Sequence, residues 1–512
     1  MDEYTPNANN VITNNMFGRL DIYASFDEIT PDNIISELNT ALVYHVQNLM
    51  QEDFLYWYRR NVQPILNRRK EVRPDIMNIV QENHADEIVT FKNGYFLTQP
   101  AFYVSRRKGV QNKVNKLNEF LYRSGKQQAD NELVNWFHTT GKAPLYVEPH
   151  DDPEVPFKAY ALDPRSAFVV YSLRPGNAPM MGVNFVVADE KALFDVYTRD
   201  YVFHLSGAVT GKMLTTEVNH DFIASASSID SVEPNVLGYI PIIEYRYNDV
   251  NMGAFESVLP LLDAINTVQS NRIDGVEQFI QSLAVAVNCQ FEEGTTANSI
   301  RQAGMIVLKS IGENKADFKI LSEQLNQSET QVLVDYLYTQ VQRICAMPLV
   351  ARTGNTYDST GSAALVTAGW YQADAACRGT EDLFKKSNRY FDEIIVDILR
   401  RKNILDISLN DFELQFVRNE TSNCQSKAQA FQTLMAAGFH PELAAAKSGI
   451  SNDPVSDMKM SEKYLKMIWG DPSSVDKAEK SGNEEEKVAA EGEARIVEAD
   501  ADNGEDTIGG AV

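Results

Sequence analysis

Two predicted helices most constrain how this 512-residue chain can fold. Between Gly253 and Leu283 apolar residues recur every three or four positions, which predicts a helix roughly 45 Å long at 1.5 Å per residue. Pro260 marks either the true start of this helix or a kink in it. A second helix is predicted from Ser328 to Ala346, because the pattern continues to that point and Met347-Pro348 then ends it.

The insert between the two helices, residues 284–327, has the pattern strand, short helix, strand, strand. Helices of similar character on both sides of such an insert indicate a helical hairpin with a small module at its tip. An ordinary hairpin inside one globule would have the same spacing, so the sequence leaves both arrangements open.

A polar loop and a long helix follow the second helix. Residues 351–361 read ARTGNTYDSTG, and the pattern after them predicts a helix from Ser362 to Lys402, roughly 60 Å long if unbroken. Gly369 and Gly379 allow a bend within it. Because one domain core rarely covers a helix of that length, we expect a neighbouring copy of the chain to bury its sides. Small residues in its first turns would let neighbouring helices approach closely: Ala363, Ala364, Ala368, Gly369, Ala373, Ala375 and Ala376.

The remaining pattern predicts a mainly helical α+β chain. Helical spacing is found in residues 31–60 and 112–138, whereas residues 79–104 are mixed, with turn signals at Asn93-Gly94 and Gln99-Pro100. Short β-rich runs at hairpin spacing between about Lys142 and Tyr247 predict an antiparallel sheet. Together these segments indicate an α+β lobe.

Charge limits the classes of partner. The net charge is −24, and residues 471–512 hold 13 Asp/Glu against 4 Lys/Arg. Nonspecific affinity for nucleic acid comes from basic residues that displace counterions, so a conventional DNA binder is excluded. A protein that lets DNA pass without binding it is not excluded.

The search for reaction chemistry is negative. The Gly-Lys pairs lack the spacing of a phosphate-binding loop, and the zinc-protease, hydrolase and kinase motifs are absent from the sequence. We therefore expect no catalytic residue, no metal and no cofactor. The four cysteines are too far apart for CxxC pairs and are expected to be buried thiols. The apolar runs are too short to span a membrane, and the acidic, polar N-terminus is not typical of a secretory signal.

Residues 56–60, YWYRR, interleave aromatic and basic side chains. Such a set could stack on nucleic acid. We favour instead a helix face that packs in the core and leaves its arginines exposed.

Four stretches together resemble the portal proteins of tailed bacteriophages, most closely those of the siphovirus type. They are DEIVTFKNGYFLTQPAFY at 86–103, ALDPRSAFVVYS at 161–172, GYIPIIEYRYNDVNMGAFESVLPLLDAIN at 238–266 and TGNTYDSTGSAAL at 353–365. Each is weakly specific alone, and the resemblance depends on their succession over residues 50–465.

The resemblance implies a portal-type fold with wing, stem, clip and crown, assembled as a ring of twelve subunits around a central channel. It assigns residues 1–250 and 362–423 to the wing, 251–283 and 328–347 to the stem helices, 284–327 to the clip, 348–361 to a tunnel loop, 424–470 to crown helices and 471–512 to an acidic disordered tail. The loop residues facing DNA would be Arg352, Thr353, Gly354, Asn355, Thr356, Tyr357, Asp358 and Ser359. The clip contacts would be Arg301, Lys309 and Lys315.

The resemblance also implies partners and place. Double-stranded DNA would pass through the ring, which would contact the terminase large subunit, an adaptor or head-completion protein, the major capsid protein and scaffolding protein. The protein would lie at a capsid vertex of the virion, after assembly in the host cytoplasm and without a membrane. The tail is expected to be a solvated segment, or alternatively a contact to scaffolding or packaged contents.

Two alternatives remain at this point. Another capsid-vertex or adaptor protein could share the helical hairpin, and a soluble enzyme could lie in the α+β lobe. An enzyme would require converging titratable residues, which the sequence does not display.

Overall fold

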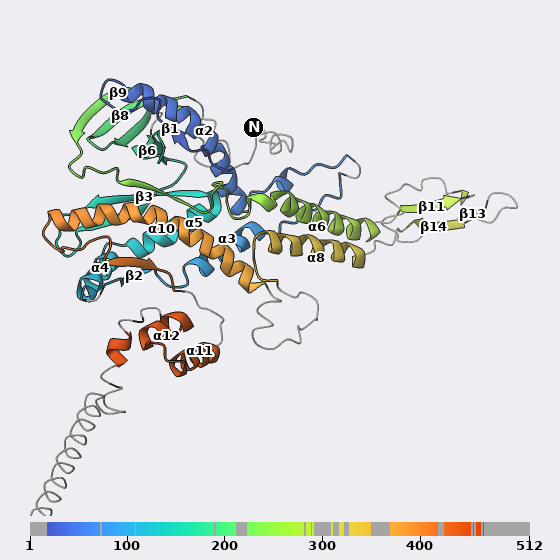
Figure 1. Cartoon of the computed structure of the whole chain (residues 1–512). Coiled ribbons are helices and arrows are strands. Elements are labelled where there is room, and N and C mark those ends of the chain that lie inside the picture. Colours follow the sequence, from blue (N-terminus) through green and yellow to red (C-terminus); the bar gives the residue numbers. More distant parts are fainter. Residues whose placement is uncertain are drawn as a thin grey trace, which may run out of the picture. The chain divides into compact units, whose positions relative to one another are not determined.

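The computed structural model describes most of the chain and divides it into two units, Met1–Thr421 and Ser422–Val512 (Figure 1). The described residues are 18–71, 74–107, 109–188, 191–210, 223–280, 283–287, 289–290, 309–310, 317–321, 327–349, 369–417, 424–451, 454, 457–461 and 464. Strands and helices both contribute to the first unit, as the predicted α+β class requires.

A six-stranded sheet forms one layer of the first unit. Its order is β1(Ile22–Tyr23), β5(Ala167–Tyr171), β6(Pro179–Ala188), β7(Lys191–Tyr197), β8(Tyr201–Thr210) and β9(Ile223–Pro234). The β1–β5 pair is parallel and the other pairs are antiparallel. Helix α2(Ile34–Arg59), which matches the helix predicted over 31–60, covers one face of the sheet with apolar side chains such as Leu38 and Leu42.

The outer edge of this sheet is capped by α2. The side-chain amide of Asn39 donates to the Ala226 carbonyl (3.0 Å) and accepts from the Ala226 N–H (2.8 Å). Strand β9 also has two irregularities in its register with β8, between His204 and Leu205 and between Ser206 and Gly207 on the β8 side. Side-chain capping and bulges are both ways in which proteins blunt an exposed edge strand.

A second, three-stranded sheet has the order β10(Ile242–Arg246), β3(Lys142–Pro149) and β4(Phe157–Ala161). The prediction of one antiparallel sheet over 142–247 was therefore wrong in topology, although its strands exist. Hairpin spacing identifies neighbouring strands along the chain. It does not show that β10, after five strands of the other sheet, returns to pair with β3.

Helices α4(Gln111–Arg123), α5(Lys126–Thr140) and α10(Trp370–Arg401) pack with the three-stranded sheet around one core. A further pair, β2(Phe102–Ser105) and β15(Phe412–Gln415), joins segments that are about 300 residues apart in sequence. The long helix was predicted from Ser362 with a possible bend at Gly369 or Gly379. Gly369 has φ +80° and lies directly before α10, so the break at Gly369 is the correct alternative, whereas Gly379 lies inside the helix. Its described part of 32 residues is about 48 Å long.

The buried side of α10 is covered by this chain itself. Phe384, Phe391 and Ile394 are each no more than 1% exposed. This side of the helix is therefore covered within the chain, and the expected cover of its other sides by a neighbouring copy stays a prediction. Of the small residues predicted at its start, Ala373 is buried, Ala375 and Ala376 are exposed, and Ala363, Ala364 and Ala368 lie outside the described residues.

Helix α3(His84–Phe96) corrects the turn predicted at Asn93-Gly94, because both residues lie inside it. Asn93 donates to Asn135 Oδ1 (2.9 Å), and its own Oδ1 lies 2.7 Å from His138 Nδ1. These contacts with α5 fix a helical Asn that local propensity would place in a turn. The other turn signal, Gln99-Pro100, does fall between α3 and β2.

The second unit contains α11(Cys424–Ala436) and α12(Pro441–Ser448), which pack on each other. The α12 helix has Pro441 in its first turn and Gly449 in the left-handed conformation at its end, as is common for helix starts and stops. Within the described part of the chain, no helix is long and apolar enough to span a membrane.

Candidate functional site

The predicted helical hairpin is present in the first unit. A 3-10 turn, η2(Glu256–Val258), leads into α6(Leu259–Ile280), and α8(Gln327–Ile344) packs beside α6 (Figure 1). Helix α6 begins six residues later than predicted, with Pro260 in its first turn, so the alternative in which the proline marks the start is the correct one. Leu283, the predicted last residue, already belongs to strand β11(Leu283–Val287).

The base of the hairpin packs into the α+β lobe through a shared apolar core. Phe255, Leu262 and Ile265 of the first arm meet Val334 and Val341 of α8 there. Tyr58 of α2 is fully buried in the same core, and its hydroxyl donates to Asp263 Oδ1 (2.8 Å). The hairpin therefore begins inside the lobe.

Backbone segments approach unusually closely where the hairpin leaves the lobe. A Cβ on Gly141 would lie 2.0 Å from the Asn251 carbonyl oxygen, and one on Gly253 would lie 2.3 Å from the Thr139 oxygen. Only glycine fits such approaches, and Gly141 also has φ +92°. Two backbone hydrogen bonds stabilise this region: Ala254 N donates to His138 O (2.7 Å), and Arg19 N donates to Asn251 O (3.0 Å).

An extended segment, which we call the strap, runs along one side of α6. It is defined here as residues 76–83, between α2 and α3. Alternate strap residues donate their backbone N–H to every fourth residue of α6: Glu82 to Asn266 Oδ1 (2.8 Å), Val80 to Ser270 Oγ (3.0 Å) and Asn78 to Asp274 Oδ1 (2.7 Å).

The spacing of the N–H donors on the strap matches the spacing of the acceptors on α6. Two residues of an extended chain advance about 6.6 Å and four residues of a helix about 6.0 Å, so the rungs stay in step. Asn266, Ser270 and Asp274 are all at least 97% buried, which the strap explains. Sequence reasoning missed this ladder, although its signal was available as polar residues at i, i+4 and i+8 inside a predicted amphipathic helix.

Asp274 is the most heavily contacted rung. It receives Lys70 Nζ (2.9 Å) and Arg68 Nη2 (2.8 Å) in addition to Asn78. Burial would raise the pKa of this carboxyl, but the hydrogen bonds and cations outweigh that effect and lower the pKa to about 2.

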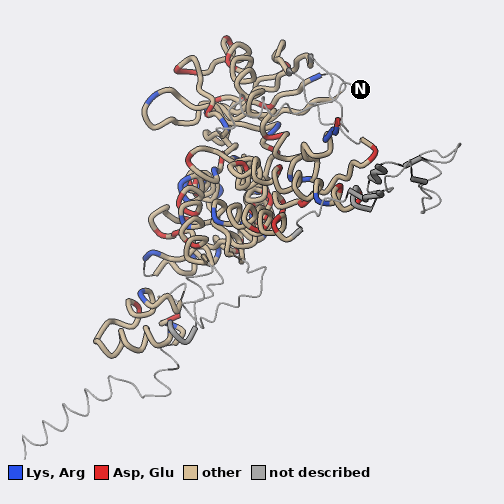
Figure 2. The backbone as a smooth tube through the Cα atoms, turned by 90° about the vertical axis from the view of Figure 1, so that its right-hand side faces the viewer, with Lys and Arg blue, Asp and Glu red and all other residues tan. Residues whose placement is uncertain are grey.

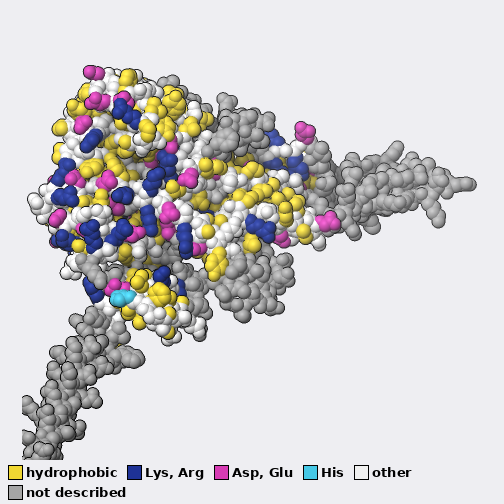
Figure 3. All heavy atoms as spheres, in the orientation of Figure 1, with side chains coloured by type: hydrophobic (Ala, Val, Ile, Leu, Met, Phe, Trp, Pro, Cys, Tyr) yellow, Lys and Arg dark blue, Asp and Glu magenta, His cyan; other side chains and the backbone are white. Residues whose placement is uncertain are grey.

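Other faces of the hairpin leave large apolar side chains uncovered. Val332, Tyr336 and Ile344 of α8 are 68%, 59% and 54% exposed, and Ile273 and Val276 of α6 are also exposed. Figure 3 shows hydrophobic side chains gathering over this part of the molecule. A contiguous apolar surface of this kind is typical of a protein–protein contact.

Charge on the hairpin is mildly acidic. The two helices carry five carboxylates, Asp263, Asp274, Glu277, Glu329 and Asp335, against Arg272 and Arg343, a net charge of −3. Elsewhere the two signs are interspersed (Figure 2). The two described hairpin helices thus carry no basic excess of the kind that binds nucleic acid.

The predicted tunnel-loop residues, Arg352 to Ser359, lie outside the described residues, as do Arg301 and Lys315 of the insert. Lys309 belongs to strand β13(Lys309–Ser310), which pairs with β12(Cys289–Gln290). Strand β11 pairs with β14(Asp317–Leu321). The predicted β character of the insert is therefore correct in its described strands.

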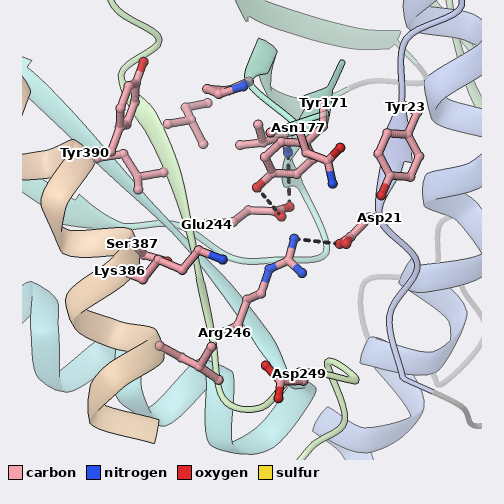
Figure 4. Close-up of a pocket in the computed structure, with 16 residues that line it drawn as sticks. Asp21, Tyr23, Tyr171, Asn177, Glu244, Arg246, Asp249, Lys386, Ser387 and Tyr390 are labelled. Atoms are coloured by element: carbon pink, nitrogen blue, oxygen red, sulfur yellow. Dashed lines mark hydrogen bonds and ion pairs between the residues drawn. The ribbon is translucent and has the colours of Figure 1, made fainter. Parts of the chain in front are cut away.

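A pocket of about 510 Å³ lies between the two sheets and α10 (Figure 4). Two contacts inside the pocket use groups of its lining: Arg246 forms an ion pair with Asp21 (3.0 Å), and the Tyr171 hydroxyl donates to Glu244 (3.0 Å). Lys386 from α10 and Asp249 complete the charged lining. No group of three or more His, Cys, Asp or Glu residues suited to a metal ion is found among the described residues.

The YWYRR stretch forms the end of α2, with Arg60 directly after the last helical residue, and its arginines contact other side chains of the protein. Arg60 lies 4.5 Å over the Tyr56 ring and is exposed, as expected. Arg59 is not exposed: its side chain contacts Asp86 (2.9 Å) and Asn135 (2.7 Å), so that part of the prediction was wrong. The predicted free thiols are found at Cys345 and Cys377, both buried.

Comparison with known proteins agrees with this arrangement. The family model described as "Phage portal protein, SPP1 Gp6-like" matches residues 47–471, which is most of the chain. A comparison with curated proteins finds no match. The match favours the portal over the adaptor and enzyme alternatives, since portal proteins are structural and not enzymatic. From its sequence, this chain belongs to the SPP1 Gp6-like family of phage portal proteins.

Proposed function

We propose that twelve copies of this chain close into a ring at one capsid vertex, with a central channel through which DNA is packaged, retained and ejected. Membership of the portal family establishes the portal role, and the family is one of oligomeric rings with capsid and packaging partners. The observation that carries the proposal is the exposed apolar surface of α6 and α8, because Val332, Tyr336 and Ile344 need a neighbour to leave water.

In this proposal the α6–α8 hairpin is the stem, the lobe of residues 1–250 with 362–423 is the wing, and the insert 284–327 is the clip. Residues 348–361 form the tunnel loop, and 424–470 form the crown. Each inter-subunit stem contact would gain roughly 25 cal/mol per Å² of apolar surface buried. Repetition around a closed ring multiplies that gain.

The proposed mechanism is a passive conduit and valve. Asp274 is buried and paired with Lys70 and Arg68, so the stem carboxylates that would repel phosphates and let a duplex slide are Glu277, Glu329 and Asp335. The loop residues from Arg352 to Ser359 would surround the duplex with hydroxyl and amide groups and little net charge. The packaging motor supplies the work, while the ring guides and holds the DNA.

The partners in this proposal are the terminase large subunit, an adaptor protein, the major capsid protein and scaffolding protein. Arg301, Lys309 and Lys315 of the insert are proposed contacts to the motor or adaptor. Assembly would take place in the host cytoplasm before incorporation into the capsid.

Electron microscopy of the purified full-length chain tests the ring directly. Annular particles with a central channel are expected, and mass measurement of the same sample gives the subunit number. A chain that stays monomeric at high concentration, with no annular particles, would overturn the proposal. A ring of another size would overturn only the number twelve.

A further inference from the structure

His84 lies where the strap, α3 and both helices of the hairpin meet. The residue is 7% exposed, and both ring nitrogens face carboxylates: Nδ1 lies 2.7 Å from Glu87 Oε2, and Nε2 lies 2.8 Å from Glu82 Oε2. A neutral imidazole carries one N–H and one lone pair, so it can donate to only one of the two carboxylates. The arrangement therefore fits the imidazolium form.

The two carboxylates extend the contact to the hairpin. Glu87 Oε1 accepts from the Tyr338 hydroxyl of α8 (2.5 Å), and the Tyr338 ring lies 4.5 Å from the His84 ring. Glu82 Oε1 accepts from Gln269 of α6 (2.6 Å). The imidazolium thus lies at the centre of a hydrogen-bonded chain that runs from Gln269 of α6 to Tyr338 of α8.

We propose that His84 is a pH-sensitive latch between the hairpin and α3, closed when the imidazole is protonated and loosened when it is neutral. Loss of the proton would leave one ring lone pair against a carboxylate. The end of the strap would then lose the contact between Glu82 and His84 and be held less tightly, although the bonds of Glu82 to Asn266 and Gln269 would remain. The latch lies within one chain, so it does not depend on ring formation.

The groups around the ring set the direction of the effect. The facing groups in these contacts are Glu82 from the strap, Glu87 from α3 itself and Tyr338 from α8, while α6 contributes the neutral Gln269. Burial lowers the pKa of His84, but the hydrogen bonds and charges of Glu82 and Glu87 outweigh burial and raise it. The latch is therefore fully closed below the ordinary histidine pKa and opens as pH rises through the raised value.

Hydrogen exchange of the full-length chain tests the latch. Protection factors of the strap amides of Val80 and Glu82 are measured at pH 6 and pH 9 and corrected for intrinsic exchange. About tenfold loss of protection is expected at the higher pH, because the charge-assisted hydrogen bond between the imidazolium and Glu82 would be lost. Absence of any loss would overturn the proposal.

Three variants identify the titrating group. His84→Phe keeps a ring against Tyr338 but cannot titrate, so its strap protection should not change with pH. Glu82→Gln supplies an amide that can donate to a neutral imidazole, so the pH step should shrink in this variant even if His84→Phe fails to fold. His204→Phe, on the sheet beside Asp195, is the matched control and should retain the full step. A step of equal size in Glu82→Gln and in the unchanged chain would also overturn the latch.

Discussion

Arg19 and Glu256 form an ion pair in which both side chains are completely buried, with 2.5 Å between Nη2 and Oε1. The pair joins the segment before β1 to η2, the turn that starts the hairpin. Glu256 also accepts the Gly253 N–H (2.8 Å), whereas Arg19 Nε and Nη1 have no hydrogen-bond partner among the described residues. Glu256 therefore supplies a negative charge that compensates the buried guanidinium of Arg19.

Removing the Glu256 carboxylate should destabilise the folded chain. We expect Glu256→Ala to lower the free energy of unfolding by about 3–5 kcal/mol, because the guanidinium would stay buried without a counter-charge. Urea unfolding measures the loss. The control is Asp27→Ala, which breaks the exposed pair with Arg174 and should change the free energy of unfolding little. Equal losses in the two variants would contradict the role given to burial.

The close approach at Gly141 makes a second prediction. Gly141→Ala should destabilise the chain by about 3 kcal/mol or more, because the new Cβ meets the Asn251 backbone in addition to adopting a strained φ. Gly125→Ala is the matched control: its φ is +76°, but nothing lies within 4 Å of the new Cβ, so about 1–2 kcal/mol is expected. Thermal or urea unfolding of both variants separates steric clash from backbone strain, and similar losses would refute the clash.

The Asp274 rung should stabilise the chain in a pH-dependent way. Its pKa is depressed to about 2, so its contribution is present above the ordinary aspartate value and is lost as pH falls from about 4 towards 2. Asp274→Asn should lower the free energy of unfolding by about 2 kcal/mol at pH 7. The difference in this free energy between the variant and the unchanged chain should become smaller as the pH falls. Asp382→Asn, on the exposed side of α10, should change little at either pH. A pH-independent loss in Asp274→Asn would contradict the assignment.

The exposed hairpin surface predicts assembly defects without unfolding. The double variant Val332→Asp, Tyr336→Asp should abolish rings while the free energy of unfolding of the single chain changes by about 0.5 kcal/mol or less per substitution. Light scattering and microscopy report the assembly. Tyr122→Asp removes an equally exposed aromatic from α4 and should leave assembly intact. Normal rings from the double variant would remove the hairpin from the subunit contact.

The tunnel loop is tested by its effect on DNA. Replacing Asn355, Thr356 and Tyr357 with alanine should reduce the yield of DNA-filled heads, because the proposed loop contacts with the duplex would be lost. Ring assembly, measured on the same variant, should be unchanged. Heads that fill and retain DNA normally would argue against the assigned loop role.

The elements with strong periodicity could be predicted from the sequence. The apolar spacing identified α2 and α8 to within three residues at each end and α6 to within six, and the β-rich runs identified most strands. Spacing could not show that β10 pairs with β3, because strand partners depend on contacts distant in sequence. The Asn93-Gly94 pair also predicted a turn, at a position where contacts with Asn135 and His138 stabilise a helix.

The site was less accessible to sequence reasoning. Polar residues such as Ser270 in the middle of a helix are usually interpreted as solvent-facing, and their burial follows only from the strap across them. The tunnel-loop and most clip assignments fall outside the described residues and stay predictions. Family resemblance, which depends on the order of segments, identified the portal role where no single residue could.

The bidentate contact between Asn39 and Ala226 has a consequence for newly synthesised protein. In free subunits, an edge strand with unpaired backbone groups could pair with the edge strand of another copy and begin a fibril. The amide already occupies the hydrogen-bonding positions that a foreign strand would need at Ala226. One position of the β9 edge is thereby closed to pairing with another copy.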